Sequence, residues 1–208
     1  MGDGGGRDKP LRLGVLFFDD VEELDAVGPW EVLAFWARNV ATDPVTVLPI
    51  GLEDGPVRCA HGLSVNPDVT LAEALPLDVL VYPGGPGARH LSRDEAHLAR
   101  VRELRGEIAV LASVCTGALA LAAAGLLAGR PATTHWRAYD QLVELDSTID
   151  LRRDARYVDD GDVVTSAGIS SGIDMALALV ERFAGEPTRV KVARALAYDA
   201  RHSGQVMP

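Results

Sequence analysis

Cys115 is the residue in this chain whose type and position point most directly to covalent chemistry. It stands between an apolar run at 108–114 and an Ala- and Leu-rich segment that begins at Thr116. A buried strand that turns at once into a helix forces the residue between them into a strained turn with its side chain pushed outward. We predict that Cys115 is a nucleophile and that N–H groups at the helix start lower the pKa of its thiol. The alternative is a small buried hydrophobe, which is the usual role of a free cysteine.

Asp25 and His135 are the candidates for moving protons at such a thiol. Asp25 lies just before a Gly-Pro pair that follows the first apolar run. A carboxyl there could donate and accept a proton if it faced Cys115, or it could be a loop acid that accepts nearby N–H groups. His135 ends a short predicted strand, where it could activate the thiol or serve as a structural histidine. Cys59 lies in a short strand beside a turn and is predicted to be structural.

Two glycine-containing turns could line a pocket around these groups. The turn at 83–87 contains Gly84 and Gly85, and Gly85 is a candidate N–H donor to an oxyanion. The spacing of its glycines matches no phosphate-binding loop. The stretch 168–172, which contains Ile169, follows a strand and could line the pocket or only cap the next helix.

A sheet is needed to bring these residues together. Apolar runs at 11–18, 45–51, 78–82 and 108–114 predict buried strands, and helical patterns at 29–39, 93–104, 116–127 and 172–184 alternate with them. This alternation predicts a doubly wound α/β fold with a mostly parallel sheet and helices on both faces. If the strands that precede Asp25, Gly85 and Cys115 are neighbours, all three residues meet beyond the carboxyl ends of the sheet.

Length and composition exclude several other classes of protein. The 208 residues predict a flexible leader over 1–10 and a single domain over 11–208. Twenty Lys and Arg against 30 Asp and Glu give a net charge of −10, which argues against binding nucleic acid or an anionic membrane. Two cysteines without an apolar leader predict a reducing, cytoplasmic location. The sequence has no histidine and cysteine spacing typical of zinc, so we expect no metal.

Four stretches together resemble the ThiJ/PfpI superfamily, and the resemblance covers about residues 11–198. They are LDAVGPWEV (24–32), YPGGPG (82–87), SVCTGALALAAAGLLAGRPATTHW (113–136) and SAGISSGID (166–174). Within the superfamily they are most similar to the isocyanide hydratase branch, and they also resemble the amidotransferase-like half of AraC-type regulators. The resemblance implies a flavodoxin-like fold, similar to class I glutamine amidotransferases. It also implies a homodimer with its site near the subunit interface.

The resemblance assigns roles to the residues already singled out. Cys115 matches the elbow cysteine, Asp25 the acid beside it, and Gly85 and Thr116 the groups that hydrogen-bond around the thiolate. Ile169 falls in the loop beside the site. Peptidase-like members carry Cys-His at the elbow, whereas this chain has Cys115-Thr116. The implied reaction needs no cofactor: water adds to a small-molecule isocyanide through a Cys115 thioimidate to give an N-substituted formamide.

Two alternatives to a hydratase remain open from the sequence. The first is another cysteine-dependent hydrolase or a glyoxalase-type lyase of the superfamily. The second is a sensor without turnover, in which Cys115 would be oxidised or would bind a small molecule.

Overall fold

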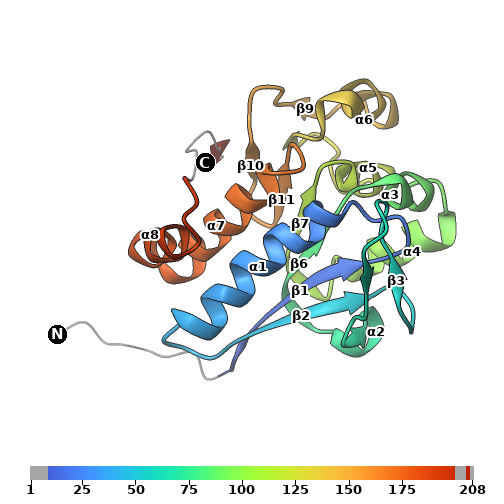
Figure 1. The fold of residues 1–208 in the computed structure, drawn as a ribbon. Helices are drawn as coiled ribbons and strands as arrows, with labels where there is room; N and C mark the ends of the chain where they lie inside the picture. Colours follow the sequence, from blue (N-terminus) through green and yellow to red (C-terminus); the bar gives the residue numbers. More distant parts are fainter. Residues whose placement is uncertain (1–8, 200–204, 207–208) are drawn as a thin grey trace.

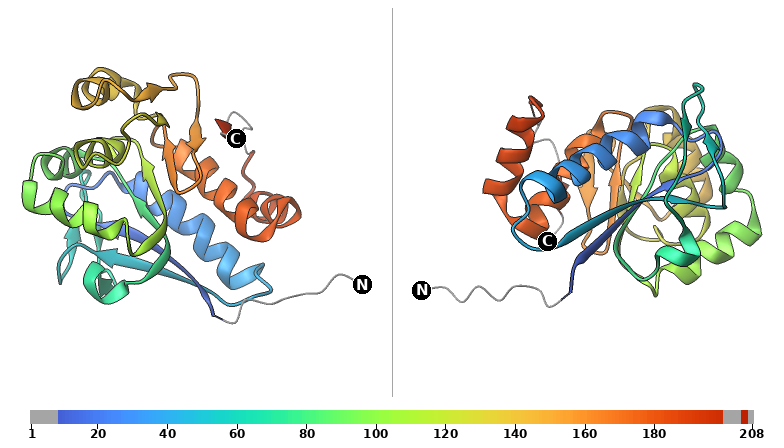
Figure 2. Two further views of the ribbon diagram at one scale, coloured as in Figure 1. Left: turned by 180° about the vertical axis from the view of Figure 1, so that it is seen from behind. Right: turned by 60° about the horizontal axis from the view of Figure 1, so that its bottom comes forward.

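The computed structural model describes residues 9–199 and 205–206. An eight-stranded sheet runs through its centre in the order β12-β10-β11-β7-β6-β1-β2-β5. Helices α1, α7 and α8 pack together on one face, and α3, α4, α5 and α6 lie on the other (Figures 1 and 2). The predicted doubly wound α/β fold is therefore confirmed.

The bounds of the elements follow in chain order. The strands of the main sheet are β1 (Leu11–Phe17), β2 (Val45–Gly51), β5 (Val69–Thr70), β6 (Leu77–Tyr82), β7 (Ile108–Val114), β10 (Tyr157–Asp159), β11 (Val163–Ser166) and β12 (Gln205–Val206). Two small pairs are formed by β3 (Val57–Arg58) with β4 (Ser64–Val65), and by β8 (Pro131–Ala132) with β9 (Asp150–Leu151). The helices are α1 (Glu23–Asn39), α2 (Leu71–Ala74), α3 (Pro86–Leu91), α4 (Glu95–Leu104), α5 (Gly117–Ala123), the 3-10 helix η1 (Trp136–Ala138), α6 (Tyr139–Leu145), α7 (Ser171–Ala184) and α8 (Glu186–Ala195).

Strands β1, β6 and β7 are parallel neighbours at the centre of the sheet. Val15 pairs with Val81, and Val81 pairs with Ala112, so these strands end at the same edge. Strand β11 continues the parallel order beside β7, while β10 pairs antiparallel with β11. The predicted meeting of the three strand ends is therefore confirmed.

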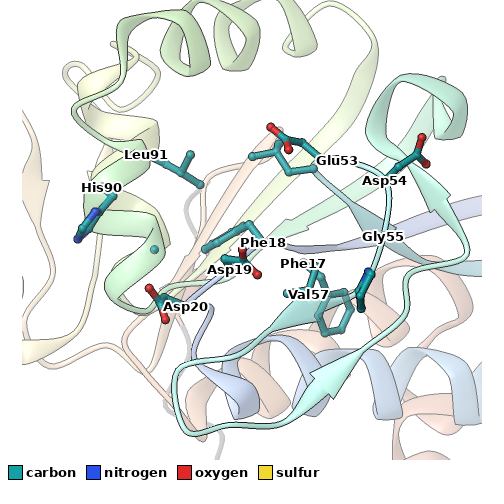
Figure 3. Close-up of a pocket in the computed structure, with 13 residues that line it drawn as sticks. Phe17, Phe18, Asp19, Asp20, Glu53, Asp54, Gly55, Val57, His90 and Leu91 are labelled. Carbon is teal, nitrogen blue, oxygen red and sulfur yellow. The ribbon is translucent and has the colours of Figure 1, made fainter.

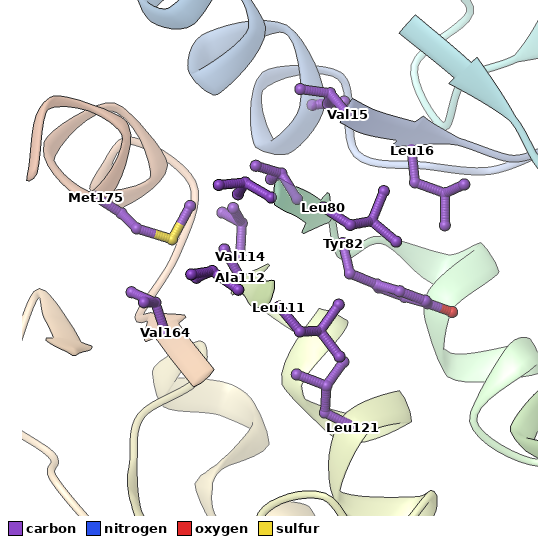
Figure 4. Close-up of a cluster of buried hydrophobic side chains, with 14 of the residues drawn as sticks. Val15, Leu16, Leu80, Tyr82, Leu111, Ala112, Val114, Leu121, Val164 and Met175 are labelled. Atoms are coloured by element: carbon purple, nitrogen blue, oxygen red, sulfur yellow. The ribbon is translucent and has the colours of Figure 1, made fainter. Parts of the chain in front are cut away.

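The sheet has an aliphatic core on both faces. Leu80, Leu111 and Met175 are among the largest side chains with almost no exposure, and Figure 4 shows them in one cluster around the central strands. Complete burial of such a side chain contributes roughly 1.5–3 kcal/mol of transfer free energy. This packed core fixes the positions of the central strands and therefore of their carboxyl ends.

Two predicted helix boundaries are wrong. Helix α1 begins at Glu23 instead of Pro29, so Asp25 lies in its first turn and Pro29 lies inside the helix. Proline has a backbone φ that suits a helix, but it has no N–H to donate to the carbonyl four residues earlier, which here is that of Asp25. Helix α5 ends at Ala123, well short of the predicted Leu127. Turns cover most of the residues from there to Gly129, which has a positive φ of 68°.

The predicted leader over 1–10 falls mostly on residues 1–8, which lie outside the described part of the chain. Among the described residues, every helix is too short or too polar to cross a bilayer.

Candidate active site

Cys115 forms a sharp turn between β7 and α5. Its backbone φ is +55°, in the left-handed region that a residue with a Cβ seldom adopts. Its N–H donates to the carbonyl of Ser166 at 3.0 Å, and its own carbonyl accepts the hydroxyl of Thr134 at 2.7 Å. Hydrogen bonds on both sides thus stabilise a conformation that would otherwise be strained. The predicted elbow geometry is present.

Gly117 makes this tight turn possible. A Cβ on Gly117 would lie 2.3 Å from the carbonyl oxygen of Tyr82 and 2.8 Å from that of Pro83. Only a residue without a side chain lets the start of α5 approach the end of β6 this closely. The contact places the elbow directly beside the glycine turn at 83–87.

Asp25 lies beside the elbow with its carboxyl fully buried. Its Oδ2 accepts the N–H of Gly84 at 3.2 Å, and its carboxyl hydrogen-bonds with the thiol of Cys115. Its Oδ1 is buried without a hydrogen-bond partner among the described residues. Desolvation, assisted by the nearby charge of Glu22, raises the pKa of Asp25 to about 7. A carboxyl with this pKa can take and return a proton near neutral pH.

The pKa of the Cys115 thiol is shifted in the direction opposite to the predicted one. Burial raises the pKa of the Cys115 thiol, and the negative charge of Asp25 raises it further. The N–H and hydroxyl of Thr116 act in the opposite direction but are outweighed. The expectation of a lowered thiol pKa is therefore wrong, because it considered the helix start and neither the burial of the thiol nor the charge of Asp25. A thiol with its pKa raised in this way is protonated near neutral pH.

Thr116 and Gly85 form a second contact between the elbow and the glycine turn. The N–H of Gly85 donates to Thr116 Oγ1 at 2.9 Å, and the hydroxyl of Thr116 lies 3.3 Å from the Gly85 carbonyl that it can donate to. Gly85 has a positive φ of 117°, and a Cβ there would lie 2.4 Å from the backbone nitrogen of Glu22. The N–H of Gly85 is therefore occupied by Thr116, and the predicted role as an oxyanion donor does not fit this arrangement.

Gly84 fits between the two reactive groups. A Cβ on this residue would lie 2.6 Å from the backbone nitrogen of Thr116 and 2.8 Å from Asp25 Oδ2. The absence of a side chain lets its N–H reach the carboxyl. Gly84 thus belongs to the site through its backbone.

His135 lies next to the site but is not bonded to the thiol in the structure. It caps η1, and its Nδ1 accepts the N–H of Arg137 at 3.3 Å. Burial and the positive charges of Arg137 and Arg89 lower its pKa, so the ring is neutral at pH 7. Its ring packs on Gly168, where a Cβ would lie only 2.8 Å from the imidazole. The structure therefore brings His135 together with the 168–170 loop.

A hollow of about 360 Å³ lies at this loop, and we call it the aromatic cleft. It is lined by Leu24, His135, Trp136, Tyr139, Ala167, Gly168, Ile169 and Ser170. Ile169 lines this hollow and is 36% exposed, and its role in binding at the Cys115 site stays a prediction.

A second hollow of about 360 Å³ lies at the ends of β1 and β2 and against α3 (Figure 3). Phe17, Phe18 and Val57 give it an apolar floor, and its rim is acidic. It is lined by Phe17, Phe18, Asp19, Asp20, Leu52, Glu53, Asp54, Gly55, Pro56, Val57, Gly87, His90 and Leu91. These carboxylates make the surface near the site unfavourable for an anionic ligand.

One group of side chains has the composition of a metal site. Glu22, Glu23 and His61 bring their ligand atoms within 4.8 Å of one another. The imidazole of His61 already contacts Glu22 at 3.2 Å, and Glu23 accepts the N–H of His61 at 2.7 Å. These contacts account for the cluster without an ion, and the absence of a metal stays a prediction.

Cys59 has a different environment from Cys115. It is buried, and its N–H donates to the carbonyl of Leu63 at 2.8 Å within the β3–β4 turn. Burial and the charges of Glu23 and Asp19 raise the pKa of its thiol. This is the environment expected of the structural cysteine that the sequence predicts.

The sequence reasoning missed Thr134 and Ser166. Both are fully buried, and both bond to the backbone of Cys115. Their bonds join β7 to segments that follow much later in the chain. Thr134 uses its hydroxyl, which is too common in sequences to identify an anchor, and Ser166 uses its backbone carbonyl, which any residue could supply.

The fold and these contacts define an α/β protein with a cysteine elbow and a buried acid at the carboxyl edge of its sheet. The chain belongs to the DJ-1/PfpI family, which matches residues 12–182.

Its relatives include enzymes of more than one activity. An isonitrile hydratase from Pseudomonas putida is 38% identical over 188 residues, covering 90% of this chain and 78% of that protein. A glutathione-independent glyoxalase, DJR-1.2 from Caenorhabditis elegans, is 28% identical over 176 residues, covering 80% and 85%. The crystal structure of a ThiJ/PfpI family protein from Pseudomonas syringae superimposes with a TM-score of 0.81 at 26% identity, covering 97% and 83%.

Proposed function

We propose that this protein is an isocyanide hydratase that converts R–NC and water into the formamide R–NH–CHO. The observation that carries the proposal is the buried Asp25 carboxyl beside the Cys115 thiol. Its pKa is raised to about 7, and its Oδ1 has no partner among the described residues. The similarity to an isonitrile hydratase over 90% of the chain supports the same reaction.

The first step joins the sulfur of Cys115 to the terminal carbon of the isocyanide. Asp25 takes the thiol proton as the S–C bond forms, and it returns this proton to the same carbon. The product is the thioimidate R–N=CH–S, covalently bound to the enzyme. A carboxyl with a pKa near 7 is a suitable base here, because about half of it is ionised at neutral pH and the ionised form is basic enough to share the proton.

The second step adds water to the thioimidate carbon. Asp25 takes a proton from the water as the C–O bond forms and passes it to the nitrogen, which leaves R–NH–CH(OH)–S on the enzyme and Asp25 again ionised. The C–S bond then breaks, the hydroxyl proton returns through Asp25 to the sulfur, and the formamide leaves. The Oδ1 atom of Asp25 is the acceptor available to the attacking water, since Oδ2 is bonded to Gly84.

The backbone supports both steps by holding the sulfur in place. The N–H and hydroxyl of Thr116 hydrogen-bond to the sulfur and stabilise negative charge on it when the thioimidate breaks down. Thr134 and Ser166 hold the elbow from the other side. None of these roles requires a cofactor.

The test is turnover of an aryl isocyanide, followed by chromatographic detection of the formamide. We expect turnover by the wild type, none by Cys115→Ala, and a loss of at least 100-fold by Asp25→Asn. Cys59→Ser is the matched control, because the second cysteine takes no part in the reaction. Turnover that survives Cys115→Ala would refute the thioimidate mechanism.

A glyoxalase-type reaction is the second candidate, favoured by the similarity to DJR-1.2. Methylglyoxal also presents an electrophilic carbon to a thiol, and Asp25 could move its protons. Lactate formation from methylglyoxal, measured beside isocyanide turnover under the same conditions, decides between the two. A sensor without turnover predicts no product from either substrate and peroxide oxidation of Cys115, which mass spectrometry detects.

A further inference from the structure

Three lining residues of the aromatic cleft are chain neighbours of residues that contact Cys115. Leu24 directly precedes Asp25, and His135 directly follows Thr134, whose hydroxyl bonds to the Cys115 carbonyl. Ala167 directly follows Ser166, whose carbonyl accepts the Cys115 N–H. Each of these three lining residues adjoins a residue that contacts Cys115, which places the cleft next to the Cys115 site.

The walls of this cleft expose large apolar side chains. Trp136 is 63% exposed, Leu24 is 40% exposed and Ile169 is 36% exposed. These three are half of the large hydrophobic side chains that are exposed in the described part of the chain, and they come from α1, η1 and the 168–170 loop. Apolar side chains that gather from distant segments around one hollow mark a surface that contacts an apolar ligand.

Two rings of the cleft are held in position by arginines. The guanidinium of Arg137 lies 4.8 Å from the centre of the Trp136 ring, and that of Arg153 lies 4.9 Å from the centre of the Tyr139 ring. The hydroxyl of Tyr139 also donates to the Arg153 carbonyl at 2.6 Å. Cation–π contacts of this kind limit ring motion, so the cleft presents flat, partly ordered aromatic surfaces.

The lining carries no carboxylate, lysine or arginine side chain among its described residues. Its polar groups are the imidazole of His135, the Tyr139 hydroxyl and Ser170. A volume of about 360 Å³ is at the lower end of ordinary small-molecule sites and accommodates one or two fused rings. A neutral, flat and apolar group fits this cleft better than a charged or strongly polar one.

We propose that the aromatic cleft binds the substituent R of the substrate and selects isocyanides whose R is a neutral aromatic ring. Trp136 is the specificity-determining residue, and the ring of R packs against it with Leu24 and Ile169 at its edges. This inference rests on the proposed hydration at Cys115, because R is the group attached to the nitrogen of the isocyanide that reacts there.

The first experiment measures binding without turnover. N-phenylformamide and N-methylformamide are titrated into the Cys115→Ala protein, and intrinsic tryptophan fluorescence is recorded. We expect saturable binding of the phenyl compound, at least tenfold tighter than the methyl compound. In the double variant with Trp136→Ala, phenyl binding weakens about tenfold. Equal affinity for the two formamides, or phenyl binding unchanged by Trp136→Ala, overturns the proposal.

The second experiment measures the ratio of kcat/KM for phenyl isocyanide to that for methyl isocyanide. Trp136→Ala is expected to lower this ratio about tenfold. Trp136→Phe keeps a ring at the position and is expected to restore most of it. Val190→Ala is the matched control, because Val190 is 47% exposed on α8 and takes no part in the cleft. A ratio that does not change in Trp136→Ala overturns the assignment.

The two experiments separate this proposal from the proposed function. Selective binding of N-phenylformamide without turnover of any isocyanide leaves the cleft intact and refutes the hydratase. Turnover without aromatic preference refutes the cleft alone. Sedimentation of wild type and Trp136→Ala adds a third outcome. A change in oligomeric state with an unchanged substrate ratio would show that the exposed apolar side chains serve contact between copies of this chain, and it would overturn the proposal.

Discussion

The hydroxyl of Thr134 donates a 2.7 Å hydrogen bond to the carbonyl of Cys115, in the interior of the protein. This bond joins the elbow to the segment that leads into His135 and the aromatic cleft. Its neighbour Thr133 is equally buried, but the Thr133 hydroxyl has no partner among the described residues. Two adjacent threonines with the same burial thus differ in whether their hydroxyl groups are hydrogen-bonded.

This contrast predicts the effect of one conservative substitution. Thr134→Val leaves the Cys115 carbonyl buried without its partner, so we expect a loss of about 1–3 kcal/mol in the free energy of unfolding. Turnover should fall as well, because the elbow loses one of its two anchors. Thr133→Val removes a hydroxyl that has no partner in the described part of the chain, and it is expected to be neutral or stabilising. Urea unfolding of both variants makes the comparison, and equal destabilisation would contradict it.

The pKa of Asp25 predicts how stability depends on pH. Burial raises it from 3.8 to about 7, so the folded state binds this proton more tightly than the unfolded chain. The stabilising contribution is complete below about pH 4 and is lost as the pH rises through about 7. Asp25→Asn lacks this titration. Relative to the variant, wild type should therefore lose up to about 4 kcal/mol between pH 4 and pH 8. Urea midpoints of wild type and Asp25→Asn at several pH values measure the difference.

The same carboxyl predicts the pH dependence of catalysis. Asp25 must be ionised to take the thiol proton, so kcat/KM should rise with pH and level off above an apparent pKa of about 7. The raised pKa of the Cys115 thiol means that a free thiolate does not produce this rise. A profile with its midpoint near 5 would indicate an ordinary exposed acid. Steady-state rates in buffers of constant ionic strength provide the profile.

The close approach at Gly84 predicts a steric effect on the site. Gly84→Ala would place a Cβ 2.6 Å from the backbone nitrogen of Thr116 and 2.8 Å from Asp25 Oδ2. We expect the carboxyl and the elbow to move apart, with turnover reduced by at least 100-fold and stability lowered by roughly 1–3 kcal/mol. Gly106→Ala is the control, because its nearest neighbouring atom is at 3.6 Å. Normal turnover in Gly84→Ala would contradict this prediction, because it would show that catalysis does not need the close approach of the Asp25 carboxyl to the Cys115 elbow.

The sequence predicts the scaffold well because local signals suffice for it. Apolar runs identified β1, β6 and β7, and the rule for parallel strands placed their ends together. The position of Cys115 between strand and helix was readable for the same reason. Pro29 misled the prediction, since its ring is compatible with the interior of α1 when neighbouring contacts hold the helix.

What the sequence could not show depends on contacts between distant segments. The pKa of Cys115 is raised first by burial and then by the charge of Asp25 on α1, and the local argument from the helix start gives the opposite direction. The occupation of the Gly85 N–H by Thr116 is likewise a tertiary contact. Chemistry at this site therefore follows from three-dimensional proximity more than from any motif.

The elbow is held in place through its main chain, by Ser166, Thr134 and the close approach of Gly117. We therefore expect the backbone position of residue 115 to stay the same when another atom replaces the sulfur of its side chain. Replacing the side chain of residue 115 would leave these main-chain contacts unchanged, so the backbone of the elbow and the reactive atom can vary independently. This independence makes the protein a suitable starting point for engineering, in which serine or selenocysteine could be tested at residue 115 without a change in backbone position.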